Sequence, residues 1–505
     1  MLFPKELSLE IKLHQRLNFL KGASFLMRPS YAYSILNSNI AKYLIEYEIK
    51  LRPLQTKLTE RAYKYNMIYN PLTSNCLFNK MHKAIFSFIS FCLLFLCSNL
   101  NAQSILNSPL SYIGMGELYP AEPATNLMMG GIGVSNSNGI YANSINPALL
   151  ARNHYTVFEV GVNTELKTLQ DYRQKQQVFG GNYESLQLTL PISNRWTASI
   201  GIRPHSAVDY TTKSYRRLNL LGVDSLIYGY EGKGSVTKLS FANGLRIGRE
   251  FYLGLEVSYL FGTVNRNVST QNMSDGQFYK IQLENLNSYS DFSFKAGLAY
   301  RKSLKNDFFV NFGATMDLTS KMSATQLNRF AILDLSGMNM INADTLRNTY
   351  NFSQNLPVTT RVGLSLEKIA AWMVGIDYSQ TDWSKVDNNL GRSAKPLPVS
   401  SKWSIGGEYT PDFTSVSNYF KRTTYRIGFS YAKTPYDFSA NGNYAVDKNL
   451  SLGVAFPLRN LSYLNVSYQV GKRGVLADNG MEEQYHRITF GLTLSDLWFQ
   501  KQKIN

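Results

Sequence analysis

Apolar and polar residues alternate at every second position over most of the chain, from about residue 155 to residue 494. A period of two is typical of a β-strand that has one apolar and one polar face. The pattern is clear in residues 195–203 and returns in residues 251–259, 372–379, 424–431 and 487–494. The apolar positions of these segments are Trp196, Ala198, Ile200 and Ile202; Phe251, Leu253, Leu255, Val257 and Tyr259; Trp372, Val374, Ile376 and Tyr378; Tyr425, Ile427, Phe429 and Tyr431; and Ile488, Phe490, Leu492 and Leu494.

A soluble β-sandwich would also bury one face of each strand, so alternation alone does not decide between a sandwich and a membrane barrel. The pattern predicts about 14 to 15 strands, which is more than one sandwich uses. Charged residues are nearly absent from the apolar positions, as lipid contact demands, because a Lys or Arg at the bilayer midplane costs about 2–4 kcal/mol. Aromatic residues form 13% of the chain, and many stand near strand ends, where they favour the membrane interface.

We therefore predict an all-β fold, a transmembrane antiparallel β-barrel of about 14 strands over residues 153–499. The sheet must close because a bilayer offers no water to an open sheet edge. With strands of about 10 residues, the remaining sequence must form loops. We expect long polar loops near residues 170–182, 218–230, 265–287 and 322–355, and a short C-terminal tail at 500–505.

An apolar run at residues 84–97 follows two lysines and predicts a secretion signal. The run is shorter than the roughly 20 apolar residues that a spanning helix needs. We expect a signal peptide over residues 81–102, with cleavage after Ala102. Lipid attachment at Cys97 is the alternative, and the large Leu96 before that cysteine disfavours it.

Residues 1–80 show neither a sustained period nor a repeat. We interpret them as an upstream extension, disordered or loosely helical, that is not part of the native protein. A short cytoplasmic helical domain is the alternative.

Removal of residues 1–102 lowers the formal net charge from +17 to +9. A moderate positive charge suits a protein beside anionic lipid and lipopolysaccharide, although a soluble basic protein has the same balance. Lys and Arg form no stripe, which argues against nucleic acid as a partner. The three cysteines, Cys76, Cys92 and Cys97, all precede the expected cleavage site, so the exported chain has neither a disulfide nor a thiolate metal site.

The sequence offers no catalytic or metal-binding constellation. His154, His205 and His486 are too far apart for a His-x-x-x-His metal set. The glycines at residues 130–133 lack the third glycine of a dinucleotide-binding motif. Glu256 and Asp377 fall on the polar faces of strands, where a solvated wall carboxylate is the simplest interpretation. We expect no enzyme activity, no metal and no cofactor.

The period of two fails between residues 103 and 152, which predicts a folded segment that is not strand. Within it, Asn146, Pro147 and Ala148 predict a turn with proline at the first position of a short helical turn. We expect Asn146 to hold this segment to the barrel wall by hydrogen bonds, while Pro147 fixes the turn.

Two patches of sequence resemble the FadL-type long-chain fatty acid transporters and related aromatic-hydrocarbon porins. The first is the glycine cluster followed by Asn146-Pro147-Ala148, placed between a signal peptide and the first strand. The second is residues 356–389, which resemble a late hairpin of that family. The residues that match its motif are Asp377, Tyr378, Asp382, Trp383 and Ser384.

The resemblance implies a 14-stranded barrel with an N-terminal hatch, here residues 103–152, an extracellular hydrophobic site, and a lateral opening at a kink in the third strand. Pro204 is the candidate for that kink, because proline donates no ladder hydrogen bond. The alternative is that Pro204 only begins a loop.

The resulting hypothesis is a monomeric channel in a Gram-negative outer membrane for passive uptake of hydrophobic small molecules, such as long-chain fatty acids or aromatic hydrocarbons. An alternative within the same superfamily is an interaction or shuttle protein for a secretion system. A soluble exported binding module is the third possibility, and release from washed membranes by carbonate would identify it.

Overall fold

The computed structural model describes residues 108–497, apart from residues 121, 137, 221–222, 273–278, 320, 335–346, 387–395, 437–442 and 459–460. The predictions for residues 1–80, for the signal peptide at 81–102 and for the tail at 500–505 lie outside the described residues, as do residues 103–107 of the predicted hatch. None of the helices in the described ranges has the length and apolar character that a membrane crossing requires.

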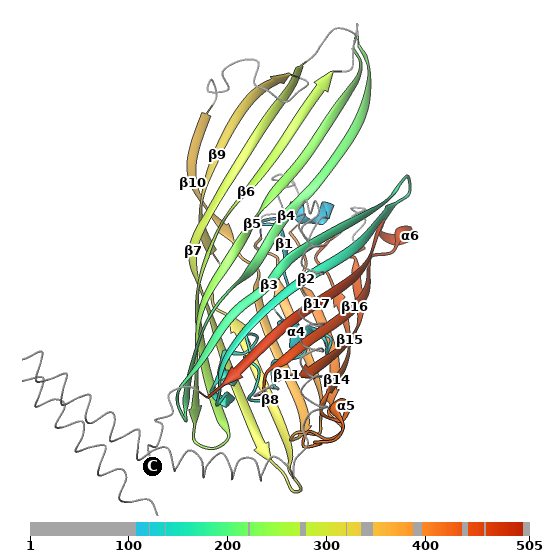
Figure 1. Cartoon of the computed structure of the whole chain (residues 1–505). Coiled ribbons are helices and arrows are strands. Elements are labelled where there is room, and N and C mark those ends of the chain that lie inside the picture. The colour runs from blue at the N-terminus through green and yellow to red at the C-terminus, as the bar shows by residue number, and fades with distance from the viewer. Residues whose placement is uncertain are drawn as a thin grey trace, which may run out of the picture. The chain divides into compact units, whose positions relative to one another are not determined.

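The described chain consists mainly of strands that belong to one sheet (Figure 1). Two short helices, α5 (Tyr419–Arg422) and α6 (Leu476–Asn479), lie in turns between strands. The strands are β1 Glu117–Leu118, β2 Thr156–Asp171, β3 Lys175–Ser193, β4 Trp196–Leu220, β5 Val223–Ile247, β6 Phe251–Asn272, β7 Tyr279–Ser303, β8 Phe308–Asp317, β9 Lys321–Asp334, β10 Arg347–Asn355, β11 Val358–Lys368, β12 Trp372–Asp382, β13 Ser400–Tyr409, β14 Thr424–Lys433, β15 Val446–Pro457, β16 Tyr463–Arg473 and β17 Met481–Asp496.

The sheet closes into an antiparallel barrel because the last strand, β17, pairs with β2. Strands β8 and β9 both pair with β7 and occupy one position in the barrel wall. Strands β10 and β11 occupy the next position, since β10 pairs with β9 and β11 pairs with β8. With β1 inside the barrel, the wall has 14 strand positions, which confirms the predicted fold class.

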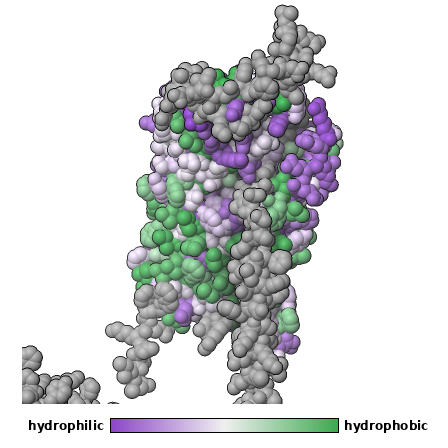
Figure 2. Space-filling model, turned by 45° about the horizontal axis from the view of Figure 1, so that its top comes forward, coloured by the Kyte–Doolittle hydropathy of each residue, from purple (hydrophilic) through white to green (hydrophobic). Residues whose placement is uncertain are grey.

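A belt of exposed apolar side chains surrounds the barrel wall, as the alternation predicts. On β6 the belt extends from Phe251 to Phe261, which are 51% and 36% exposed. This length matches the 9 to 11 residues that a tilted strand needs to cross a bilayer. Figure 2 shows hydrophobic residues over the middle and lower wall and hydrophilic residues over one end. The apolar face of each strand therefore faces lipid.

Strands β4 to β7, β9 and β10 continue well beyond the belt, and we call this part of the sheet the outer extension (Figure 1). Short turns, such as residues 194–195 and 248–250, lie at the opposite end of the barrel, which in such proteins faces the periplasm. Strands β4, β5 and β7 each have 25 residues, more than twice what a membrane crossing needs.

The expectation of long loops is therefore wrong. Residues 170–182, 218–230, 265–287 and 322–355 are largely strand, in β2 and β3, β4 and β5, β6 and β7, and β9 and β10. Outside the bilayer both faces of a sheet can be polar, so the hydropathy alternation fades there while the ladder of backbone hydrogen bonds continues.

Residues 108–155 lie inside the barrel, and we call them the inner segment (Figure 1). They contain η1 (Pro109–Tyr112), β1, α4 (Ala124–Leu127) and η2 (Pro147–Arg152). The inner segment hydrogen-bonds to wall strands as far apart as β7, β12, β15 and β16. It therefore fills the lumen at the height of the belt.

Close contact between the inner segment and the wall depends on glycines that face the lumen. A Cβ atom at Gly254 would overlap the backbone nitrogen of Ala148, and one at Gly428 would overlap the backbone of Met129. Only glycine lets two backbones approach this closely. The glycines whose Cβ would meet the inner segment form a belt across most of the wall: Gly244, Gly254, Gly297, Gly313, Gly363, Gly375, Gly406, Gly428, Gly453 and Gly491.

Candidate functional site

The ladder between β3 and β4 ends halfway along both strands. Its last pair is Leu186 with Ile202, although β3 extends back to Lys175 and β4 extends on to Leu220. Above that pair the two strands part (Figure 1). The barrel wall therefore has a seam between β3 and β4 on its outer half.

Pro204 lies at the base of this seam, on the third strand position of the wall. The register of β4 against β5 shifts between Pro204 and Ser206, so that His205 is the extra residue of a β-bulge. Pro204 is paired with Thr237 within a continuing strand. It thus lies inside β4 and does not begin a loop.

The inner segment covers the seam. Strand β1 pairs with β4 above the bulge, with Glu117 opposite Ala207 and Leu118 opposite Ser206. The backbone nitrogen of Tyr119 donates to the carbonyl of His205 at 3.0 Å.

Further bonds extend this cover to both sides of the seam. The backbone nitrogen of Ser108 donates to the carbonyl of Asp209 at 3.1 Å. From the β3 side, the amide of Asn182 donates to the Tyr119 hydroxyl at 2.7 Å. Residues 108–119 thus connect the two strands that the wall leaves unpaired.

Asn146 is completely buried and bonds to both the wall and the inner segment. Its Nδ2 atom donates to the carbonyl of Leu298 on β7 at 3.0 Å and to the carbonyl of Val134 at 2.8 Å. Its Oδ1 atom accepts from the backbone nitrogen of Ala148 at 3.0 Å, which caps η2. Pro147 is the first residue of η2.

Asp377 lies on β12 and is 6% exposed, so the expectation of a solvated wall carboxylate is wrong. Its Oδ2 atom accepts hydrogen bonds from the backbone nitrogens of Gly133 and Val134 at 2.7 and 2.9 Å. The inner segment covers this carboxylate. Asp377 therefore holds the glycine-rich turn of the inner segment to the wall.

The other residues of the family motif are close to Asp377 in sequence but make different contacts. Tyr378 is on the opposite face of β12, and its ring lies 4.6 Å from that of Trp403. Asp382 accepts from the backbone nitrogen of Ser384 at 2.9 Å and thereby shapes the turn after β12. Trp383 is buried and donates from its indole nitrogen to Ser400 at 3.0 Å.

Glu256 is also buried instead of solvated. It pairs with Lys238 at 2.5 Å and with Lys295 at 3.7 Å, both of which are buried on neighbouring strands. A charge in the lumen wall without water needs such partners.

Ion pairs attach the inner segment to the wall at several points, among them the pair of Arg152 with Glu367 on β11 at 3.4 Å. Arg473 on β16 contacts Glu117 at 2.7 Å, Glu483 at 3.2 Å and Asp447 at 3.3 Å. Lys402 on β13 contacts Glu122 at 3.1 Å. Burial alone would raise the pKa of Glu122, but the positive charges of Lys402 and Arg361 outweigh it and lower that pKa to about 2.

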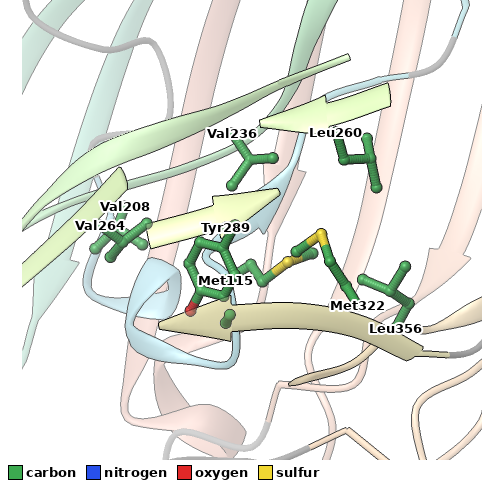
Figure 3. Packing of buried hydrophobic residues seen from close by; sticks show 9 residues of the cluster. Met115, Val208, Val236, Leu260, Val264, Tyr289, Met322 and Leu356 are labelled. Atoms are coloured by element: carbon green, nitrogen blue, oxygen red, sulfur yellow. The ribbon is translucent and has the colours of Figure 1, made fainter. Parts of the chain in front are cut away.

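A buried apolar cluster lies between the inner segment and the wall. Figure 3 shows Met115 of the inner segment beside Tyr289 and Met322 of the wall. Together they are the hydrophobic lid of the lumen, which consists of Met115, Val208, Val236, Leu260, Val264, Tyr289, Met322, Ala324 and Leu356.

Exposed apolar side chains continue from this lid along the inner face of the outer extension. Register pairs Tyr230 with Val268 and Val268 with Leu283 across three strands. These residues share the face of the lid because they are an even number of positions from Val236, Val264 and Tyr289. Tyr230, Val268 and Leu283 are 40%, 37% and 43% exposed.

The foot of the seam is hollow. A small pocket lies there between the inner segment and the wall strands. Leu186 and Ile202, the last pair of the ladder, line it together with Glu122, Glu184 and Arg203. The pocket thus combines apolar and charged walls at the point where the strands part.

The histidines lie apart in the fold. His205 is the bulge residue on β4, and His154 is an exposed residue just before β2. His486 is exposed on β17, where its Nδ1 atom lies 2.8 Å from the Tyr468 hydroxyl. Within the described ranges, no group of three or more His, Cys, Asp or Glu side chains could hold a metal ion.

The glycine belt, the Arg473 group and strand β1 were not predicted from the sequence. The belt left a signal, because glycine recurs at the polar positions of several strands, among them Gly254, Gly375, Gly428 and Gly491. For the pair of Arg473 with Glu117 and for the two residues of β1 the sequence holds no comparable signal, since these partners are more than 80 residues apart.

Comparisons with known proteins give one family match. A family model described as BamG matches residues 81–505. No curated protein matches the sequence. The family is a different one from the FadL-type family that the two sequence patches resemble.

Similar solved structures include a FadL homologue from Pseudomonas aeruginosa, with 13% identity, a TM-score of 0.49, and coverage of 75% of this chain and 98% of that one. The toluene transporter TodX of P. putida also has 13% identity and a TM-score of 0.49, covering 76% of this chain and 100% of that one. The CymD monoaromatic hydrocarbon channel has 14% identity and a TM-score of 0.48, covering 77% of this chain and 98% of that one.

Proposed function

This chain belongs to the BamG family, and we propose that it is a monomeric outer-membrane channel for passive uptake of hydrophobic small molecules, such as long-chain fatty acids or aromatic hydrocarbons. The observation that carries the proposal is the seam, which ends the β3 and β4 ladder at Leu186 and Ile202. A membrane barrel with an unpaired stretch in its wall has a route from the lumen sideways into lipid.

The proposed path begins on the inner face of the outer extension. Tyr230, Val268 and Leu283 offer exposed apolar surface to a ligand arriving from outside. Removal of apolar surface from water contributes about 25 cal/mol per Å², which is enough to bind a hydrocarbon chain without a specific polar contact.

From this face the ligand reaches the hydrophobic lid. Val208 of the lid is on β4 beside Ala207, and Ala207 is paired with Glu117 of β1. The hydrophobic lid therefore lies close to the seam, and residues 108–119 form the barrier between the two. Displacement of these residues joins the apolar path to the seam, whose β3 side exposes Phe179, Tyr183 and Leu186 toward lipid.

The rest of the inner segment is the proposed hatch. Asn146, Pro147 and Ala148 fix it against β6 and β7, and Asp377 fixes its glycine turn against β12. These contacts keep the lower lumen filled while residues 108–119 move. Such a division explains how a hydrophobic ligand leaves sideways without opening an aqueous pore.

A disulfide across the seam tests the proposal. Leu118 and Ser206 face each other between two hydrogen-bonded pairs of the β1 and β4 ladder, where Cβ atoms come close enough for a bridge. The sequence has no cysteine after Cys97. We expect the oxidised Leu118→Cys/Ser206→Cys protein to take up radiolabelled oleate slowly in whole cells, and the reduced protein to recover the original rate.

The two single cysteine variants are the controls and should show no dependence on reductant. Oleate and toluene are tested separately, so that a block of one ligand alone defines the substrate class. Unchanged uptake of both ligands by the oxidised double variant contradicts lateral exit.

Two further variants address the residues predicted from sequence. Pro204→Val restores a ladder donor at the base of the seam, and we expect slower uptake because the ladder can then extend. Asn146→Ala removes the bonds to Leu298 and Val134 and should also change uptake. Unchanged uptake in both variants excludes roles for Pro204 and for the Asn146 anchor.

The outer extension favours a second candidate function, an interaction or shuttle protein for a secretion system. A channel for small molecules does not need strands of 25 residues. Co-purification of secreted proteins with the detergent-solubilised barrel, lost when the outer extension is shortened, would support this candidate.

A further inference from the structure

The part of β4 above the seam has one paired and one open edge. Residues Ser206 to Arg217 pair with β5 without a change of register. On the other edge, β1 and Ser108 bond to β4 only as far as Asp209. From Tyr210 onward, no residue of the part of the chain that the structure describes pairs with this edge.

The direction of the open backbone groups follows from the alternation of a strand. The carbonyls of His205 and Asp209 accept bonds from the inner segment, so odd-numbered residues direct their backbone groups away from β5. Thr211, Lys213 and Tyr215 continue this series. They present a row of backbone donors and acceptors that matches an added strand.

The side chains along this edge are exposed and their charge has one sign. Lys213, Tyr215 and Arg216 are all exposed, and Tyr215 is 69% exposed. The acid that faces Thr211 across the ladder is Glu231, which is paired with Lys233 at 2.7 Å. The open edge of β4 therefore carries positive charge that has no ion-pair partner among the side chains that the structure describes.

The opposite side of the seam also carries positive charge. Arg173 and Lys175, at the turn between β2 and β3, are exposed. The acid beside them, Asp171, accepts bonds from the backbone nitrogens of Arg173 and Gln174 in that turn. The hairpin on the other side of the seam therefore also carries exposed positive charge.

We propose that the open edge of β4 at residues 211–215 is a docking site for an extended, acidic segment of another protein, which adds to the sheet as an antiparallel or parallel strand. The row of open backbone groups selects a polypeptide, and the exposed positive charge selects acidic side chains. The exposed side chains of β4 at residues 211–216 are polar or charged apart from Tyr215, so the docked segment is in water outside the membrane.

The experiment measures binding of a dye-labelled peptide of alternating Glu and Val to the full chain in lipid nanodiscs, by fluorescence anisotropy. A second peptide has the same sequence with N-methyl groups on alternate residues, which removes the backbone donors of one edge and keeps the charge. We expect the first peptide to bind and the N-methylated peptide to bind about five- to tenfold more weakly.

Two variants of one residue separate backbone from side chain. Tyr215→Pro removes one open backbone donor, and Tyr215→Ala removes the ring but keeps the donor. We expect Tyr215→Pro to weaken binding about fivefold more than Tyr215→Ala does. Lys213→Glu/Arg216→Glu reverses the charge and should abolish binding of the acidic peptide. Because these residues are exposed, the variants should keep the barrel folded, which unheated gel mobility verifies.

Three results overturn the proposal. The first is equal binding of both peptides, because attraction of charge alone then explains the affinity. The second is no binding to the unmodified protein, because the edge is then covered or does not accept a strand. The third is peptide binding that Tyr215→Pro and Lys213→Glu/Arg216→Glu leave unchanged, because the peptide then binds elsewhere.

Discussion

The Oδ2 atom of Asp377 lies 2.7 Å from the backbone nitrogen of Gly133. The same oxygen accepts from Val134, so one carboxylate on β12 holds two consecutive backbone nitrogens of the inner segment. A buried carboxylate without such donors would be costly, and hydrogen bonds to a charged group contribute about 1.5–3 kcal/mol each.

Replacement of Asp377 should loosen the inner segment without unfolding the barrel. Asp377→Ala removes both acceptor contacts, and we expect backbone amides near Gly133 to exchange with deuterium about 10- to 100-fold faster. Asp377→Asn keeps one acceptor and should have a smaller effect. Asp412→Ala, in an exposed turn, is the control and should leave exchange near Gly133 unchanged. Equal exchange in Asp377→Ala and the unmodified protein contradicts the anchoring role.

The close contact at Gly254 gives a second prediction. Gly254→Val places a side chain where the backbone nitrogen of Ala148 lies, and such overpacking costs about 1–3 kcal/mol or more. The wall should persist while the inner segment is displaced and becomes sensitive to protease. Unheated gel mobility reports the wall, and the fragment pattern after limited proteolysis reports the inner segment.

The matched control is Gly181→Ala on β3. The nearest atom to a Cβ there is the carbonyl oxygen of Asn163 at 3.5 Å, which is an ordinary contact. This variant should resemble the unmodified protein in both assays. A protease-resistant inner segment in Gly254→Val would show that the glycine belt is not required for the fit.

The alternation of apolar and polar residues in the membrane-crossing part of each strand was predictable because it depends only on residues of that strand. Phe251 to Phe261 alternate within one strand, and lipid on one side forces that alternation wherever the wall crosses the bilayer. The strand count follows from the same signal. The outer extension escaped prediction because water on both faces removes the constraint, so residues 265–287 resemble a loop by composition.

The site was predictable only where a residue acts through its own neighbours. Asn146 and Pro147 form a turn that the local sequence specifies, and the turn is present. The partners of Asp377 and Glu256 come from distant parts of the chain, so the sequence could not distinguish a buried carboxylate from a solvated one. The seam depends on where the pairing between β3 and β4 ends. Pro204 is the one residue in the local sequence that indicated this position.

The Arg473 group predicts a large loss of stability from one substitution. Arg473→Met leaves Glu117 and Glu483 buried without the arginine that pairs with both, and loss of one partner of a buried ion pair costs about 3–5 kcal/mol. We expect a corresponding decrease in the free energy of unfolding in urea, measured in lipid vesicles. Addition of Glu117→Gln to Arg473→Met should recover part of the loss, because one of the unpaired charges is then gone.

The neighbouring residue on β16 is the control for this substitution. Lys472 pairs with Glu482, and its side chain is 50% exposed. An exposed pair contributes about 0–1 kcal/mol, so Lys472→Met should change the free energy of unfolding little. Similar losses for Arg473→Met and Lys472→Met would mean that burial does not distinguish the two pairs.

The pair of Glu122 and Lys402 predicts a dependence on pH. The pKa of Glu122 is lowered to about 2 in the folded protein, against 4.5 for the ordinary side chain. A lowered pKa means that the ionised form stabilises the fold, that this stabilisation is fully present above about pH 4.5, and that it is lost as the pH falls toward 2. Glu122→Gln should therefore destabilise the protein at neutral pH and make little difference near pH 2. The urea midpoint of both proteins, measured at intervals between pH 7 and pH 2, tests this. A difference that persists at pH 2 would assign the effect of Glu122 to packing, and one that disappears by pH 5 would contradict the lowered pKa.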